Sequence, residues 1–192
     1  MTKHTNRTRS RVFVIIAILV VGYIIFDRMM EKYEQSVLVG ESPKSIILKQ
    51  IAEKEKIKVL PEWKLHNLSG GVFESSYLKG DVALITFWSS ACGVCRSELP
   101  LLKELDAQYK DKGFKIVGIA LDDHDDDDLR AFVMGEKINY IVLRGDRKVT
   151  KAFGEIDVVP QSFLVDRKGN VIKYFLGKID PKEIRSLIEL AL

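Results

Sequence analysis

The sequence has little cysteine and little histidine. Its 192 residues contain two cysteines, Cys92 and Cys95, and three histidines, which show no spacing typical of metal ligands. A zinc site needs about four ligands, so the cysteine pair does not indicate one. A structural disulfide is also a poor explanation, because a bridge over so short a loop constrains the unfolded chain very little. The pair therefore indicates redox chemistry.

An excess of positive charge is also missing from most of the chain. The formal net charge is +3, but residues 1–11 hold Lys3, Arg7, Arg9 and Arg11 without any acid, so the rest of the chain sums to −1. The basic isoelectric point thus reflects this tail alone. A basic face of the kind that binds nucleic acid is not expected.

Charge is absent from one long apolar run, residues 12–26 (VFVIIAILVVGYIIF). A membrane-spanning helix takes about 20 apolar residues, and Arg11 and Arg28 can extend outward from a shorter one. No small-residue cleavage site follows. We therefore favour an uncleaved transmembrane signal-anchor over residues 12–30 rather than a cleaved signal peptide, with the basic tail, residues 1–11, in the cytoplasm and the remainder outside.

The remaining chain divides into a linker and a domain. Residues 31–60 are expected to form a juxtamembrane linker with a short amphipathic helix beginning near Pro43. In residues 61–192 strand and helix patterns alternate, which predicts an α/β domain with a central mixed sheet flanked by helices. The expected strands cover 63–68, 82–87, 114–121, 140–143, 161–166 and 171–176, and the expected helices 93–109, 126–136, 148–154 and 181–190.

The cysteine pair lies where a buried strand ends and a helix begins. The first turn of a helix has free N–H groups and the positive end of the helix dipole. A thiolate at Cys92 is stabilised there, so its pKa is expected to fall below the ordinary value. Cys92 is therefore the predicted nucleophile, exposed to solvent. Cys95 lies on the same helical face and is predicted to be a more buried resolving thiol.

The stretch LITFWSSACGVCRSELP, residues 84–100, resembles the active site of the thioredoxin fold. Within that fold it is similar to the TlpA/ResA-like membrane-anchored thiol-disulfide oxidoreductases, whose pattern is near F-W-A-x-W-C-x-x-C-x-x-E-x-P. The resemblance extends from about Leu60 to Leu192. It implies a thioredoxin-like domain, a redox-active disulfide and no further cofactor. Two departures are Ala91, where relatives have tryptophan, and a Gly93-Val94 dipeptide without proline.

The same resemblance implies roles for residues outside the pair. Pro160 should follow a cis peptide bond and face the cysteines, and the backbone of Val159 should pair with a bound client. Independently of the resemblance, Trp88 is expected to be a core aromatic that flanks the site, and we include it among the candidate client-binding residues. The buried acid of thioredoxins is replaced by Thr86, so we expect Glu98 to be partly buried, with a raised pKa, and to help deprotonate a cysteine.

The function implied is that of an extracytoplasmic thiol-disulfide oxidoreductase in the bacterial inner membrane. It would take electrons from a membrane thiol carrier and reduce client disulfides, with apocytochrome c as the client implied by the ResA-like proteins. An oxidant on the same fold is an alternative, because the residues between the cysteines tune the potential. A Sco-like copper chaperone and a peroxiredoxin are disfavoured, since the C-x-x-x-C pattern of the first and the sequence context of the second are missing.

A run of six aspartates falls within residues 122–128. Carboxylates suit a hard cation such as calcium or magnesium, but the spacing of an EF-hand is absent. The favoured interpretation is a loop before a helix, because acids are favourable at a helix N-terminus.

Overall fold

The computed structural model describes residues 28, 56–123 and 125–192. Its internal contacts divide the chain into two units, residues 1–48 and 49–192, and the architecture below is that of the second.

The expectations for the N-terminal part lie outside these described residues. They comprise the cytoplasmic tail, nearly all of the transmembrane signal-anchor and most of the juxtamembrane linker. Among the residues that are described, no helix is long and apolar enough to cross a membrane.

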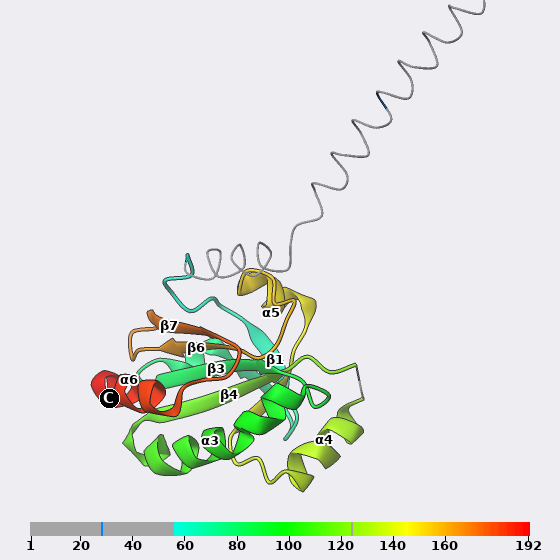
Figure 1. Cartoon of the computed structure of the whole chain (residues 1–192), viewed down its shortest axis with the longest axis horizontal. Helices are drawn as coiled ribbons and strands as arrows, with labels where there is room; N and C mark the ends of the chain where they lie inside the picture. Colours follow the sequence, from blue (N-terminus) through cyan, green and yellow to red (C-terminus); the bar gives the residue numbers. More distant parts are fainter. Residues whose placement is uncertain (1–27, 29–55, 124) are drawn as a thin grey trace, which may run out of the picture. The chain divides into compact units, whose positions relative to one another are not determined.

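A seven-stranded mixed sheet forms the centre of the domain (Figure 1). Its strand order is β2-β1-β5-β4-β3-β6-β7. The three central strands β5, β4 and β3 run parallel, and the strands on either side of them run antiparallel to their neighbours. This confirms the predicted thioredoxin-like α/β class. The strands are β1 (Lys64–Asn67), β2 (Val72–Glu74), β3 (Val82–Trp88), β4 (Phe114–Ala120), β5 (Ile141–Arg144), β6 (Gln161–Val165) and β7 (Val171–Leu176).

Helices cover both faces of the sheet. Figure 1 shows α5 on one side and α3, α4 and α6 on the other. Aspartate side chains N-cap three of them. Asp125, Asp146 and Asp180 accept hydrogen bonds from the first turns of α4, α5 and α6, which satisfies otherwise free N–H groups. The helices are α3 (Gly93–Tyr109), α4 (Asp126–Gly135), α5 (Arg147–Ala152) and α6 (Pro181–Ala191), with 3₁₀ turns η1 (Ser75–Leu78) and η2 (Lys110–Lys112).

Strand β3 is the middle of the core. All seven of its residues are buried, as expected for a strand covered on both faces. Leu84 and Trp88 point into the cluster beneath α3, whereas Ile85 and Phe87 point into the cluster beneath α5. Strand β3 therefore crosses the core, and Cys92 lies just beyond its carboxyl end.

The sheet extends slightly beyond the sequence prediction. Strand β2 was not expected, and it pairs antiparallel with β1 at one edge. At the other edge Val59 bridges Asn170, and the Val171 N–H donates to the Lys58 carbonyl at 2.9 Å. The last residues assigned to the linker thus contact the β6–β7 hairpin, whose turn contains Gly169 at φ 88° as predicted.

Candidate active site

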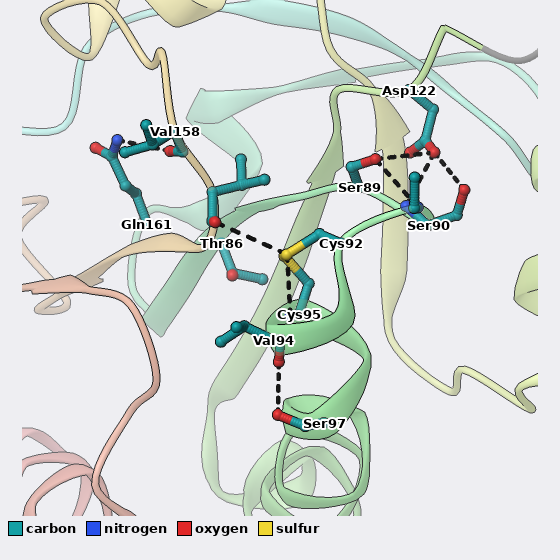
Figure 2. Close-up of a disulfide and its surroundings, with 12 residues drawn as sticks. Thr86, Ser89, Ser90, Cys92, Val94, Cys95, Ser97, Asp122, Val158 and Gln161 are labelled. Carbon is teal, nitrogen blue, oxygen red and sulfur yellow. Dashed lines mark hydrogen bonds between the residues drawn. A yellow bond between two sulfur atoms is a disulfide. The ribbon is translucent and has the colours of Figure 1, made fainter.

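Cys92 and Cys95 form a disulfide at the N-terminus of α3 (Figure 2). Cys92 is the N-cap residue, and its Sγ accepts a hydrogen bond from the Cys95 N–H at 3.1 Å. Cys92 is partly exposed, whereas Cys95 is 3% exposed. The exposures match the expected arrangement of an accessible nucleophile and a buried resolving thiol. After reduction, the same N–H and the helix dipole would stabilise a thiolate on Cys92.

The turn before Cys92 is held by a carboxylate from the loop that follows β4. Asp122 Oδ1 accepts hydrogen bonds from the Ser90 N–H at 2.9 Å, from Ser89 Oγ at 3.2 Å and from Ser90 Oγ, as Figure 2 shows. Sequence reasoning placed Asp122 in an acidic loop and gave it no part in the site. The sequence nevertheless contained a clue that Asp122 lies near the cysteine pair. Asp122 closely follows β4, and the parallel strands β3 and β4 end on the same side of the sheet.

The peptide bond between Val159 and Pro160 is cis, as the resemblance implied. The Val159 carbonyl oxygen lies 3.7 Å from Cys92 Sγ, so this loop faces the cysteine pair. The Gln161 side chain holds the loop by donating to the Val158 carbonyl at 2.7 Å, and it accepts from Tyr174 Oη at 3.0 Å. Sequence reasoning gave Gln161 and Tyr174 no role in the site.

Glu98 lies one turn after Cys95 on α3 and is 1% exposed. Its Oε1 accepts a hydrogen bond from the Ile179 N–H at 2.6 Å. Burial raises the pKa of the Glu98 carboxyl, and the Ile179 N–H and the charge of Lys178 oppose that rise. Glu98 is thus more deeply buried than the partial burial expected, and the direction of its pKa shift agrees with the expectation. Its role in proton transfer stays a prediction. Thr86 is also buried, and its hydroxyl accepts from Ser162 Oγ at 2.9 Å.

Trp88 is a buried aromatic residue beside the site. It is the last residue of β3 and is 3% exposed, with its ring 5.7 Å from that of Phe132 on α4. The expected core position of Trp88 is confirmed, because β3 is buried on both faces and Phe132 of α4 lies against the indole ring. A contribution of Trp88 to client binding stays a prediction. The exposed apolar side chains beside the pair are small ones, Val94 at 49% and Val158 at 46%.

The acidic run begins α4. Asp125 caps the helix, and Asp126 pairs with Arg144 at 2.8 Å. This is the favoured role of acids at a helix N-terminus. Within the described residues, which omit position 124, no cluster of three or more histidine, cysteine or acidic side chains could hold a metal ion.

The redoxin family model matches residues 54–189, which include the whole site described above. The chain belongs to the redoxin family. This redoxin is 31% identical over 144 residues to the thiol-disulfide oxidoreductase ResA of Bacillus anthracis, covering 72% of this chain and 81% of that one. It is 27% identical over 131 residues to the ResA of Bacillus subtilis, covering 68% and 72%.

Solved structures agree with this assignment. The redoxin domain superimposes on a putative thiol:disulfide interchange protein DsbE from Chlorobium tepidum with a TM-score of 0.64 and 29% identity, covering 70% of this chain and 95% of that one. A putative thioredoxin from Neisseria meningitidis gives 0.64 and 30%, covering 70% and 89%. The redoxin is thus a ResA-like thiol-disulfide oxidoreductase of the thioredoxin superfamily.

Proposed function

We propose that this redoxin is a disulfide reductase that acts on client proteins outside the cytoplasm. The observation that carries the proposal is the position of Cys92, whose Sγ accepts from the Cys95 N–H and lies 3.7 Å from the Val159 carbonyl. That geometry offers a stabilised thiolate beside a backbone edge on which an extended client segment would bind. The similarity to ResA proteins supports the same class of client, including the C-x-x-C-H disulfide of apocytochrome c.

The reaction transfers two electrons through two exchanges. The Cys92 thiolate attacks one sulfur of the client disulfide, which forms a mixed disulfide and releases the other client sulfur as a thiolate that takes up a proton. Cys95 then loses its proton and attacks Cys92 Sγ. This step forms the Cys92–Cys95 disulfide and releases the second client thiolate. A membrane dithiol carrier restores the pair by the reverse sequence.

Glu98 is placed to serve the second exchange. It is buried one turn beyond Cys95, and its raised pKa makes it a better proton acceptor than an ordinary carboxylate. Cys95 is 3% exposed, so bulk water has little access to its proton. We assign Glu98 the transfer of the proton that Cys95 gives up.

The proposed location rests on the apolar run at residues 12–26 and the basic tail before it. An uncleaved anchor there would hold the domain at the outer face of a bacterial inner membrane. Labelling intact cells with a membrane-impermeant thiol reagent after mild reduction tests this topology, since Cys92 is the accessible cysteine. Labelling only after the cells are lysed would contradict it.

The midpoint potential of the Cys92–Cys95 pair, measured in the full chain with redox buffers, tests the direction of electron flow. A value of about −250 mV or lower would support a reductant, and a value near about −120 mV would indicate an oxidant. Reduction of a disulfide-bonded C-x-x-C-H peptide, with Cys92→Ser as the inactive control, tests the client class. If the chain has a low potential and still does not reduce that peptide, the cytochrome role is excluded.

A further inference from the structure

Asp122 is the charged group most closely bound to the turn that leads to the nucleophile. All of its carboxylate hydrogen bonds to described residues go to Ser89 and Ser90, and all reach Oδ1. Its Oδ2 is buried and has no hydrogen-bond partner among the described residues. A buried carboxylate oxygen without a donor keeps an incompletely solvated charge next to this turn.

One peptide group connects Asp122 to Cys92. The N–H of Ser90 donates to Asp122 Oδ1 at 2.9 Å, and the carbonyl of the same peptide group, that of Ser89, accepts from the Cys92 N–H at 3.1 Å. The Ser89 hydroxyl also accepts from the Ala91 N–H at 3.3 Å. The carboxylate therefore fixes the plane of the peptide on which the position of Cys92 depends (Figure 2).

The neighbouring basic side chains contact other acids. Arg144 donates to the main-chain oxygen of Asp122 at 2.8 Å, but its guanidinium pairs with the carboxylate of Asp126 at 2.8 Å. His66 Nε2 lies 3.9 Å from the same Asp126.

On the helix side, Arg96 lies 3.6 Å from Glu136, and the buried Glu98 binds the Ile179 N–H beyond Cys95. Replacing Asp122 by a neutral residue would therefore remove one negative charge from the turn and leave these pairs in place.

We infer that Asp122 is a positioning residue that fixes the Ser89–Ser90 turn, and that its charge makes the cysteine pair a stronger reductant. A negative charge opposes a thiolate at Cys92. The reduced form, which contains that thiolate, is then less stable relative to the disulfide, so the pair gives up its two electrons more readily. The charge thus works against the helix dipole and the Cys95 N–H, which favour the thiolate.

The variant Asp122→Asn tests the charge, because it keeps the shape and an oxygen that can accept from Ser90. In the reduced full chain, the pKa of Cys92, taken from the pH dependence of alkylation, should fall by about half a unit to one unit. The equilibrium with a glutathione buffer should move about threefold toward the dithiol, which corresponds to about 14 mV. An unchanged or raised pKa would overturn the inference.

The matched control is Ser90→Ala, which removes one hydroxyl donor and keeps the charge. It should leave the Cys92 pKa and the equilibrium unchanged, while the looser turn slows client reduction by about two- to threefold. Equal shifts in both variants would assign the effect to distortion of the turn and overturn the role of the charge. The inference depends on the proposed reductant function only in what a lower potential would do for the cell. The potential of the wild-type chain tests that function, whereas the difference between variants tests Asp122.

Discussion

The two faces of the central sheet have different chemistry. Beneath α5 the core centres on Phe87, Phe153 and Phe163, all fully buried with ring centroids 4.9 to 6.2 Å apart. Beneath α3 the core contains the resolving cysteine and the carboxyls of Glu98 and Asp106. Among the described residues, buried acids occur only on α3.

Buried polar atoms on the α3 face are incompletely paired. The indole nitrogen of Trp88 and the hydroxyl of Tyr140 are buried without a hydrogen-bond partner among the described residues. The indole nitrogen of Trp63, in the cluster beneath α5, is buried and unpartnered as well. Burial, with the nearby charges of Glu98 and Asp106, raises the pKa of the Tyr140 hydroxyl well above its ordinary range. Such unpaired groups cost stability on both faces, but only the α3 face also contains the resolving cysteine and buried carboxyls. We therefore expect changes beneath α5 to affect folding alone, and changes to the cysteines and Glu98 beneath α3 to affect exchange.

The largest effect on exchange should come from Cys92→Ser. The serine hydroxyl cannot replace the thiolate, so reduction of a disulfide substrate should be lost. Stability should stay close to that of the reduced wild type, because Cys92 is partly exposed and closes only a short loop. Turnover assays and thermal unfolding under reducing conditions measure both. Turnover at the wild-type rate by this variant would show that exchange does not depend on Cys92, and it would contradict the assignment of the chemistry to the α3 face.

The largest effect on stability should come from Phe163→Ala. This residue contacts Phe87 and Phe153 in the core beneath α5, and truncation of a buried phenylalanine costs about 3 to 5 kcal/mol. Denaturant unfolding measures the loss, and the midpoint potential of the folded fraction should not change. The exposed residue Val72 on β2 provides a control, because Val72→Ala should change stability by less than about 0.5 kcal/mol. A shifted potential in Phe163→Ala would show that the two faces are coupled.

Gly118→Ala should have a smaller effect on stability, and it alters the core beneath α3. An added Cβ would lie 2.8 Å from Trp88 Nε1 and 3.0 Å from Tyr140 Cε2. Overpacking of this kind costs about 1 to 3 kcal/mol, and the fluorescence of Trp88 should report the displacement. Gly135→Ala is the control, since nothing lies within 4 Å of its Cβ. A stable variant with unchanged fluorescence would show that this face is loosely packed.

The sequence predicted the positions of the elements well, because its patterns were local. The apolar run of β3, the turn at Gly169 and the proline that opens α6 each specify their structure through neighbouring residues. Strand β2 escaped prediction because it has three residues and is stabilised mainly by pairing with β1.

The sequence predicted only those site residues that belong to a recognisable motif. Cys92, Cys95 and Pro160 belong to a pattern that can be recognised along the chain. Asp122 accepts from the Ser90 N–H, and Gln161 donates to the Val158 carbonyl. Sequence alone does not show which donor or acceptor such a side chain reaches. The sequence predicted a core position for Trp88, but it did not show that α4, which follows it by more than thirty residues, packs against the indole ring.

Glu98→Gln tests whether the buried acid on the α3 face serves exchange. If Glu98 accepts the Cys95 proton, the second exchange should slow by about tenfold near neutral pH, equivalent to about 1.4 kcal/mol in the barrier. The pH profile should also lose the inflection due to Glu98. Rapid-mixing measurements of mixed-disulfide decay across pH follow both changes. The control is Glu104→Gln on the same helix, where the side chain is 63% exposed and pairs with Arg185.

The pH dependence of stability in Glu98→Gln distinguishes a role of Glu98 in proton transfer from a purely structural role. Because burial raises the pKa of Glu98, the folded state holds this proton more tightly than the unfolded state does. The stabilisation is complete below the ordinary carboxyl pKa and is lost as the pH rises through the raised value. Glu98→Gln cannot titrate, so the stability of wild type relative to the variant should fall over that pH window. A constant difference, with an unchanged exchange profile, would make Glu98 a structural partner of the Ile179 N–H and leave the cysteine pair as the only reactive part of this face.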